Sequence, residues 1–345
     1  MMEIQTSQAT YEGQKKYYWS PAVRWEKTNM EVRIEMFSYK DFFIDMFPQF
    51  YFLTQKGISL SDIMAEFSEF DAKKLFLFLQ DLIKKRILVS SILSPAEVFY
   101  LQNHLFKNEY SEKIKYNAEE LNKFKKKHLN RAYEVYTGPK IELNKDEVLQ
   151  LISRRRTCRV FDTQNKLPYS IFSKMLSLLR QEKTEGSIRY NYASAGGLYP
   201  IDIYVYVKEA RVENVNKGLY YYSPSENSLT LIDDTCEVSK DTHYFTNQSI
   251  FGNSAFSLFL VYNAEVTMPK YGGMAYLFAA IDSGIIVGTL TLVAEQNNVG
   301  LCSIGDLNFK KIEEYFKLNE NQVLLHTLEI GLKSLESYDE VESVF

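Results

Sequence analysis

The stretch Ala193–Pro200, ASAGGLYP, carries more information about the fold of this 345-residue chain than any other segment. Its small residues let a backbone approach a planar ligand closely, and backbone amides can then bond the polar edge of that ligand. A strand-like run, Ile201–Val207 (IDIYVYV), follows directly. On its own the stretch is compatible with an ordinary glycine turn before a strand, so its meaning depends on the segments around it.

A dense basic cluster lies upstream of this stretch, at Arg154–Arg159 (RRRTCR). Guanidinium groups match phosphate oxygens in a bidentate fashion, and a threonine hydroxyl adds a further hydrogen bond. The run changes abruptly to apolar Val160 and Phe161, which favours an anchored anion site over a plain surface cluster. Downstream, Cys302–Asp306 (CSIGD) is another small-residue segment, which we expect to be a loop between a helix and a strand.

These segments, in this order, resemble the motifs of a known family. RRTCRVF is similar to the RRSxRxF phosphate motif of nitroreductase-like flavoproteins, and SAGGLYP to the SAGxLYP signature of their SagB-type dehydrogenase branch, which includes McbC-type azoline oxidases. KGLYYYSPSENSLTLI, KYGGMAYLFAAIDSG and VGLCSIGDL resemble three further segments of that branch. The resemblance covers residues 138–333. It implies an α+β nitroreductase-like, FMN-dependent sandwich with an N-terminal winged-helix-like domain.

The resemblance also implies a homodimer with two FMN sites at the subunit interface, and it implies which residues bind FMN. These are phosphate contacts at Arg155, Arg156, Thr157, Arg159 and Lys333, ring contacts at Ser194, Ala195 and Gly197 of the other subunit, and contacts near the reactive N5 edge at Ile304 and Gly305. The chain departs from the family pattern in three places. DSGI stands at Asp282–Ile285 where EAGH is usual, Gly197 replaces a common asparagine, and only Lys333 is basic near the C-terminal end of the motif region.

Lys270 and Tyr271 stand where azoline oxidases carry a catalytic Lys-Tyr pair. Aromatising an azoline removes a hydride, which the flavin takes, and a ring proton, which another group must accept. An ammonium beside a tyrosine favours the phenolate, and a desolvated lysine is the other candidate base. Asp282 is a competing base, but we expect it to be satisfied within its apolar helix. His243, the nearest histidine to the pair in sequence, lacks a recognisable partner.

The predicted function is therefore oxidation of a thiazoline or oxazoline to a thiazole or oxazole during peptide natural-product synthesis, with dioxygen reoxidising the flavin. The substrate is either a ribosomal precursor peptide, processed with a cyclodehydratase, or an intermediate on a carrier protein of a nonribosomal synthetase. Two alternatives stay open. One is an NAD(P)H-dependent nitroreductase or quinone reductase, and the other is a non-catalytic flavin-bound scaffold of a heterocycle-forming synthetase.

Composition excludes several other classes. A net charge of −4 gives no global basic field for nucleic acid. The three cysteines form no CxxC pair and no HExxH occurs, so neither a disulfide framework nor a metal site is expected. The first 19 residues lack the apolar core of a signal peptide, which favours a cytoplasmic protein.

Met274–Ala294 is long enough to span a bilayer, but Asp282 near its middle favours a helix buried on nearly all sides, in a dimer interface.

The chain divides into predicted domains 1–137 and 138–345. In the first, Glu31–Met36 predicts a strand, Ser59 and Asp71 begin two helices, and ILVSS predicts a closing strand, which is a winged-helix-like order. Its lysines are diluted by acidic residues, so we expect this domain to dock the substrate's leader or carrier rather than DNA. A solvated, mixed-charge helix is predicted between Lys107 and Arg131. In the second domain a helix is predicted at Glu147–Arg156, a hairpin at Gly218–Asp233, and strands at Phe256–Tyr262 and Gln322–Gly331.

Overall fold

A computed structural model of the chain describes residues 15–100, 102–105, 111–129, 137–143, 150–184 and 186–334. The chain forms two compact units, Met1–Phe106 and Lys107–Phe345. Of the first 19 residues, which lack the apolar core of a signal peptide, only the last five are among the described residues. The first residues of the predicted helix Glu147–Arg156 and parts of the predicted helix between Lys107 and Arg131 also lie outside the described residues.

The first unit combines short strands with helices. Its elements are β1 (Lys16–Trp19), β2 (Trp25–Lys27), β3 (Val32–Ile34), β4 (Phe37–Tyr39), α2 (Phe42–Gln55), β5 (Ile58–Ser59), α3 (Leu60–Glu66), α4 (Ala72–Lys84), β6 (Leu88–Val89), α5 (Pro95–Phe99) and α6 (Gln102–Leu105). Strands β5, β1 and β6 form one antiparallel sheet, and β2, β3 and β4 form another. The order helix, turn, helix, strand from α3 to β6 is the winged-helix-like order that the sequence predicts.

Side-chain caps begin both helices of this pair. Ser59 Oγ accepts the Asp62 N–H at 3.1 Å, and Asp71 Oδ1 accepts the Lys74 N–H at 2.9 Å. Such caps satisfy amide groups that a helix start leaves unbonded. The predicted apolar stripe of α4 is buried in the core of the unit, at Leu75, Phe78, Leu79 and Leu82. Both predicted helix starts are confirmed.

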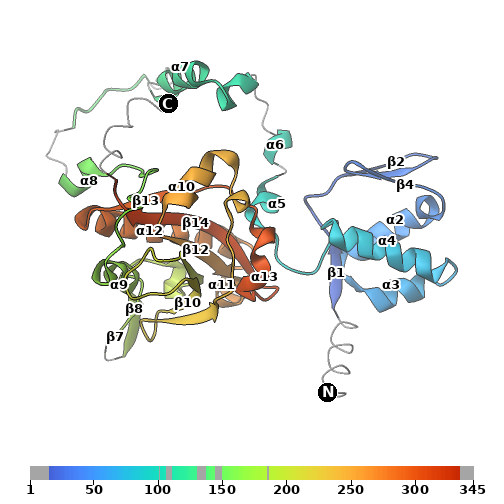
Figure 1. Ribbon diagram of the computed structural model, residues 1–345. Helices are drawn as coiled ribbons and strands as arrows, with labels where there is room; N and C mark the ends of the chain where they lie inside the picture. Colours follow the sequence, from blue (N-terminus) through green and yellow to red (C-terminus); the bar gives the residue numbers. More distant parts are fainter. Residues whose placement is uncertain are drawn as a thin grey trace, which may run out of the picture. The chain divides into compact units, whose positions relative to one another are not determined.

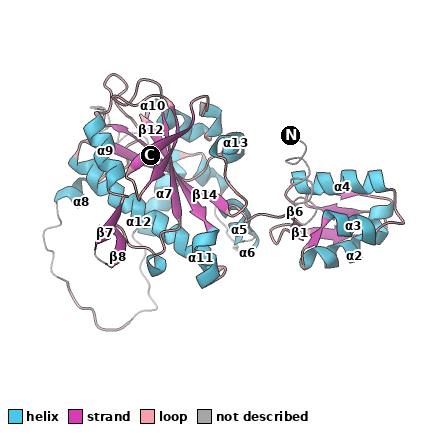
Figure 2. Ribbon diagram, turned by 90° about the horizontal axis from the view of Figure 1, so that it is seen from below, coloured by secondary structure: helices cyan, strands magenta, loops and turns pink. Residues whose placement is uncertain are grey.

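The second unit is built around one large sheet. Its helices are α7 (Ala118–Leu129), α8 (Gln150–Arg154), α9 (Tyr169–Ser177), α10 (Gln248–Asn253), α11 (Ala264–Tyr271), α12 (Met274–Gln296) and α13 (Glu313–Phe316). Its strands are β7 (Gln181–Thr184), β8 (Ser187–Tyr190), β9 (Ile201–Val207), β10 (Gly218–Ser223), β11 (Ser228–Asp233), β12 (Phe256–Asn263), β13 (Val299–Ile304) and β14 (Gln322–Leu332). The six strands pair antiparallel throughout in the order β11-β10-β9-β12-β14-β13. Figures 1 and 2 show this sheet, with β12 and β14 labelled, from two directions.

Alternate residues of the central strand β12 face different layers, because side chains along a strand point to opposite faces. Phe256 packs edge-on against Phe172 of α9, and Tyr262 packs edge-on against Tyr276 of α12. Phe259 instead packs against Phe316 of α13. Helices therefore cover both faces of an antiparallel sheet, which confirms the predicted α+β sandwich.

Two expectations need correction. Cys302, Ser303 and Ile304 are not a loop but the end of strand β13, where Cys302 lies opposite Glu329 of β14. Pairing with β14 extends the strand through these small residues, which local sequence alone did not indicate. Helix α12 is also not buried on nearly all sides within the chain. Its buried face packs on the sheet, whereas Leu277, Ile281 and Leu292 are exposed.

Helix α12 is long and apolar enough to cross a membrane by length and composition, and it is the one helix of the described residues for which this holds.

Candidate active site

The segment Ala193–Pro200 forms a tight turn whose shape depends on glycine. Gly196 and Gly197 both have φ of 65°, and Tyr199 has φ of 51°. Glycine adopts this left-handed backbone without steric cost. The Gly197 N–H donates to Ser194 O at 3.0 Å, and the Tyr199 N–H donates to Ser194 Oγ at 2.9 Å. Ser194 therefore organises the turn through both its backbone and its hydroxyl.

The carboxylate of Asp282, on the buried face of α12, bonds the same turn. It accepts from Ser194 Oγ at 2.6 Å and from the Ala195 N–H at 3.3 Å. Asp282 is only 2% exposed, and burial raises its pKa above the usual range although these two hydrogen bonds oppose the shift. Asp282 is satisfied, but not within its own helix as expected, because its partners lie in the turn, 88 and 87 residues away in sequence.

Lys270 and Tyr271, the last two residues of α11, reach the same turn. A Cβ atom at Gly196 would lie 2.3 Å from Tyr271 Oη and 2.9 Å from Lys270 Nζ, so both end groups lie directly against the Gly196 backbone. The Tyr271 ring packs edge-on against Phe278. Within the described part of the chain, neither end group has a hydrogen-bond or ion-pair partner. Both are therefore available to a bound molecule.

A cavity of about 210 Å³ lies beside the turn. Its lining is largely apolar and consists of Ala193, Ser194, Ala195, Phe278, Ile281, Asp282 and Ile285. A Cβ atom at Gly197 would meet no atom within 4 Å, so the backbone of the turn is open there. Small residues, an open backbone and apolar walls are the surroundings that suit a flat ring system.

The basic cluster lies exposed and is anchored by its buried neighbour. Arg155, Thr157 and Arg159 are exposed, whereas Cys158 is buried and its N–H donates to Leu301 O of β13 at 3.1 Å. The side chain of Arg156 is also exposed and donates to the carbonyls of Ser153 and Arg155. The donor set, several guanidiniums and a hydroxyl on one anchored segment, fits a phosphate group.

Lys333, the remaining predicted phosphate contact, has a buried partner. Its Nζ lies 2.7 Å from Glu295 Oε2, and both side chains are about one-tenth exposed or less. Lys333 also pairs with Phe161, which follows the basic cluster directly. The ammonium charge is therefore already balanced on this side of the fold.

The basic cluster and the glycine turn belong to different ends of α12. Asp282, which bonds the turn, and Glu295, which bonds Lys333, are thirteen residues apart on the helix, or about 20 Å along its axis. Within one chain, the predicted phosphate contacts and ring contacts do not come together at one point. Ile304 ends β13 and is buried, whereas Gly305 after it is exposed and open on its Cα side.

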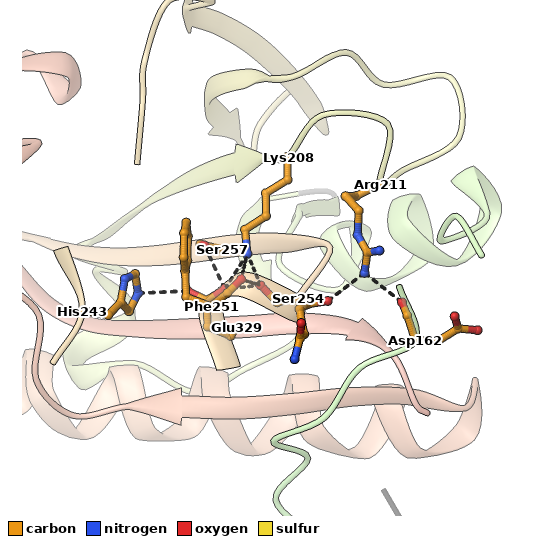
Figure 3. A network of polar contacts seen from close by, with 9 residues as sticks. Asp162, Lys208, Arg211, His243, Phe251, Ser254, Ser257 and Glu329 are labelled. Carbon is orange, nitrogen blue, oxygen red and sulfur yellow. Dashed lines mark hydrogen bonds and ion pairs between the residues drawn. The ribbon is translucent and has the colours of Figure 1, made fainter. Parts of the chain in front are cut away.

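A buried polar network, which no motif indicated, joins β14 to the segment before α10 (Figure 3). Glu329 accepts from Ser254 Oγ and from Ser257 Oγ. His243 Nε2 lies 3.4 Å from Glu329 Oε1 with both side chains fully buried, and Lys208 Nζ lies 3.7 Å from Glu329 Oε2. His243 thus lies near a buried carboxylate that the sequence did not reveal, although its ring nitrogens make no hydrogen bond within the described residues. Its backbone also bridges to Leu307, so the network supports the loop that follows Gly305.

Comparison with known proteins extends these observations. The model of the Nitroreductase family matches residues 152–331. A protein of Methanocaldococcus jannaschii described as a nitroreductase is 29% identical over 133 residues, which are 38% of this chain and 66% of the relative. The Escherichia coli Microcin B17-processing protein McbC is 27% identical over 140 residues, 39% of this chain and 51% of the relative. This chain thus matches about two thirds and half of the lengths of these relatives.

Among solved structures, a chain of the Escherichia coli microcin synthetase McbBCD complex with truncated pro-MccB17 bound has the same fold. It is 20% identical, with a TM-score of 0.50 over 79% of this chain and 97% of that chain. The family match covers more than half of the present chain, including the basic cluster, the glycine turn, the Lys-Tyr pair and α12. The chain therefore belongs to the nitroreductase family of flavin oxidoreductases, whose cofactor is FMN.

Proposed function

We propose that this protein oxidises a thiazoline or oxazoline ring, carried on a peptide, to the corresponding thiazole or oxazole. The observation that carries the proposal is the convergence of Lys270 Nζ and Tyr271 Oη on the Gly196 backbone, next to a small apolar cavity. A reductase that takes electrons from NAD(P)H has no need of an unengaged lysine and tyrosine at this point. An enzyme that must remove a carbon-bound proton does need such groups.

The reaction removes two electrons and two protons from the ring. When bound, FMN supplies the acceptor for the hydride. Lys270 or Tyr271 accepts the ring proton, so the C–H electrons on that side become the new ring double bond. Dioxygen as the terminal acceptor is part of the same proposal. The apolar walls at Phe278 and Ile281 suit the flat ring of an azoline.

The proposed FMN contacts come from the basic cluster and from the glycine turn, together with Ile304 and Gly305. Arg155, Arg156, Thr157 and Arg159 would bind the FMN phosphate, with Lys333 close to the same segment. Ser194, Ala195 and Gly197 would line the ring, and Ile304 and Gly305 would lie near its reactive edge. Because the two clusters lie at different ends of α12, each site would combine the phosphate contacts of one subunit with the turn of another in a homodimer. The exposed apolar stripe of α12 supports such a pairing.

Residues 1–137, which include the first unit, are proposed to dock the peptide. The exposed apolar side chains on the helices of that unit include Phe52 on α2 and Phe76 and Leu77 on α4. The name of the Escherichia coli relative, a Microcin B17-processing protein, supports a peptide substrate. For a ribosomal precursor peptide, the proposed partner is a cyclodehydratase. A carrier protein of a nonribosomal synthetase is the other source of such a substrate.

Two variants test the proton-handling pair. In Lys270→Ala and Tyr271→Phe, we expect single-turnover reduction of the flavin by an azoline substrate, measured anaerobically, to fall at least about 100-fold, because general base help is lost. FMN content should stay unchanged, since neither side chain is assigned a flavin contact. The double variant should be only slightly slower than the worse single variant, because the pair acts as a unit. Wild-type rates in both single variants would overturn the proposal.

Separate outcomes identify the alternatives. Rapid bleaching of the flavin by NADPH, together with no reduction by an azoline, would indicate a nitroreductase or quinone reductase. Normal product formation by a synthetase that contains the Lys270→Ala protein would indicate a non-catalytic scaffold.

A further inference from the structure

We infer that Asp282 is a positioning residue for the Lys270–Tyr271 pair: its carboxylate holds the Ser194–Gly197 turn in the one shape that receives both end groups. This inference rests on the proposed function for its catalytic consequence. The contacts that support it lie within one subunit and do not depend on a bound flavin or on a partner.

The first step is the bonding pattern of the turn. Asp282 accepts from the Ser194 hydroxyl and the Ala195 N–H, and the same hydroxyl accepts the Tyr199 N–H. One buried carboxylate thus satisfies groups at the start of the turn, and through Ser194 it also fixes the end of the turn. Tyr199 has φ of 51°, a left-handed conformation that is costly for a residue with a side chain, so the turn needs such bonds to hold it.

The second step is the fit between the turn and the pair. Tyr271 Oη and Lys270 Nζ lie against the Cα of Gly196, so closely that a methyl group there would overlap the tyrosine hydroxyl. A displacement of the turn by a few tenths of an ångström would therefore change where both end groups lie. Because Asp282 is on the rigid helix α12, the turn is fixed with respect to the helix that also carries Phe278, the ring against which Tyr271 packs.

The third step separates positioning from proton transfer. Asp282 is 2% exposed, and each of its oxygens already accepts a hydrogen bond from the turn. Both oxygens are thus engaged by the turn, although the residue also lines the cavity, so the Asp282→Asn variant decides between positioning and proton transfer. Lys270 and Tyr271, by contrast, have no bonding partner in the described part of the chain and so can reach a ligand.

The test compares Asp282→Ala, Asp282→Asn and, as a matched control, Ser283→Ala. Ser283 is also buried on α12, but its hydroxyl bonds only the Ala279 carbonyl of its own helix. An asparagine at 282 can accept the Ala195 N–H with its carbonyl and donate its amide N–H to Ser194 Oγ, so it keeps the turn but cannot serve as a base.

The first readout is amide hydrogen exchange of residues 193–199 in flavin-free protein. We expect exchange at least about tenfold faster in Asp282→Ala, and near-native exchange in Asp282→Asn and Ser283→Ala, because only the alanine variant releases the turn. The second readout is single-turnover flavin reduction by the azoline. It should fall at least about tenfold in Asp282→Ala and be rescued in Asp282→Asn.

Each contrary result has a distinct meaning. Native exchange and native rate in Asp282→Ala would overturn the inference. If Asp282→Asn keeps the turn protected but is as slow as Asp282→Ala, Asp282 is itself the base and the positioning role is wrong. Should Asp282→Ala fail to fold, Ser194→Ala, which removes the bond to Asp282 together with the bond from the Tyr199 N–H, must show the faster exchange or the inference falls. If only the proposed function fails, Lys270→Ala is as fast as wild type while the exchange result still stands.

Discussion

Gly196 is the point at which three separate parts of the chain meet. Its own turn is bonded to Asp282 through Ser194 and Ala195, and the end groups of Lys270 and Tyr271 lie on its Cα. Glycine is the residue that fits here, for two reasons. Its φ of 65° is strained for a residue with a side chain, and the end groups of Tyr271 and Lys270 occupy the space that a Cβ atom would need. Gly197 has the same φ, but a Cβ atom there would meet no protein atom within 4 Å. Comparing substitutions at the two glycines therefore separates the effect of backbone strain from the effect of the close contact.

We therefore expect Gly196→Ala to impair the reaction far more than Gly197→Ala. Both positions have φ of 65°, so a left-handed alanine costs about 1 kcal/mol at each. A methyl group at Gly197 would meet no protein atom and could disturb only the bound flavin, whereas one at Gly196 displaces Tyr271 Oη and Lys270 Nζ. The rate of single-turnover flavin reduction, normalised to bound flavin, should be at least about tenfold lower in Gly196→Ala than in Gly197→Ala. Equal rates in the two variants would show that the close contact has no role in catalysis.

Lys208 is a buried lysine whose pKa the fold changes. Burial lowers its pKa from the usual 10.5 to about 8, although Glu329 opposes the shift. Between these two pH values the unfolded chain keeps a proton on Lys208 that the folded chain has released. The unfolded state therefore binds more protons there, and the contribution of Lys208 to the free energy of unfolding rises with pH.

The matching prediction concerns wild type and Lys208→Met. Below pH 8 the folded protein carries the cost of a buried ammonium, and this cost disappears as the pH rises toward 10.5. The difference in free energy of unfolding between wild type and Lys208→Met should thus move in favour of wild type from pH 8 to pH 10. Denaturant unfolding of the two proteins at a series of pH values measures it. A difference that does not change with pH would show that Lys208 titrates normally in the fold.

At the scale of elements, the sequence predicted those helices and strands that depend on neighbouring residues, such as capped helix starts and apolar strands. The capped starts of α3 and α4 follow from Ser59 and Asp71, and β9 follows from its apolar run. Strand β13 was not predicted through Cys302, because only its pairing with β14 makes that segment extended. Helix α2, for which the sequence analysis made no prediction, contains Pro48, and its core contacts at Phe47 and Phe50 outweigh the cost of that proline.

The same distinction applies to the site. The basic cluster, the glycine turn and the Lys-Tyr pair were predicted because each lies in a motif that resembles the family. The bond from Ser194 to Asp282 and the contact of His243 with Glu329 join residues far apart in sequence. Nothing in a single sequence states which distant carboxylate meets which donor, so these contacts required the structure.

At the scale of the whole molecule, α12 has a surface that a single chain leaves uncovered. Leu277, Ile281 and Leu292 are exposed on it, and Gly284 and Gly288 are open on their Cα side, so a second helix could approach closely. The same helix separates the phosphate cluster from the glycine turn by about 20 Å. Both features support the proposed twofold dimer, in which each FMN would bridge the phosphate cluster of one subunit and the turn of the other.

A mixture of two inactive variants tests this arrangement. Arg155→Ala with Arg159→Ala should lose flavin, because the charge-assisted bonds to the phosphate are removed, and Lys270→Ala should retain flavin but fail in catalysis. Since Lys270 lies on the turn of its own chain, a hybrid dimer of the two variants has one doubly defective site and one intact site. After unfolding and joint refolding, half of the dimers are hybrids, so the mixture should regain about a quarter of the wild-type rate.

Each variant refolded alone supplies the control and should stay inactive. If every site is instead built within one subunit, each chain in the mixture keeps its own defect. The mixture would then be no more active than the two variants measured separately, which would refute the shared site even if light scattering shows a dimer.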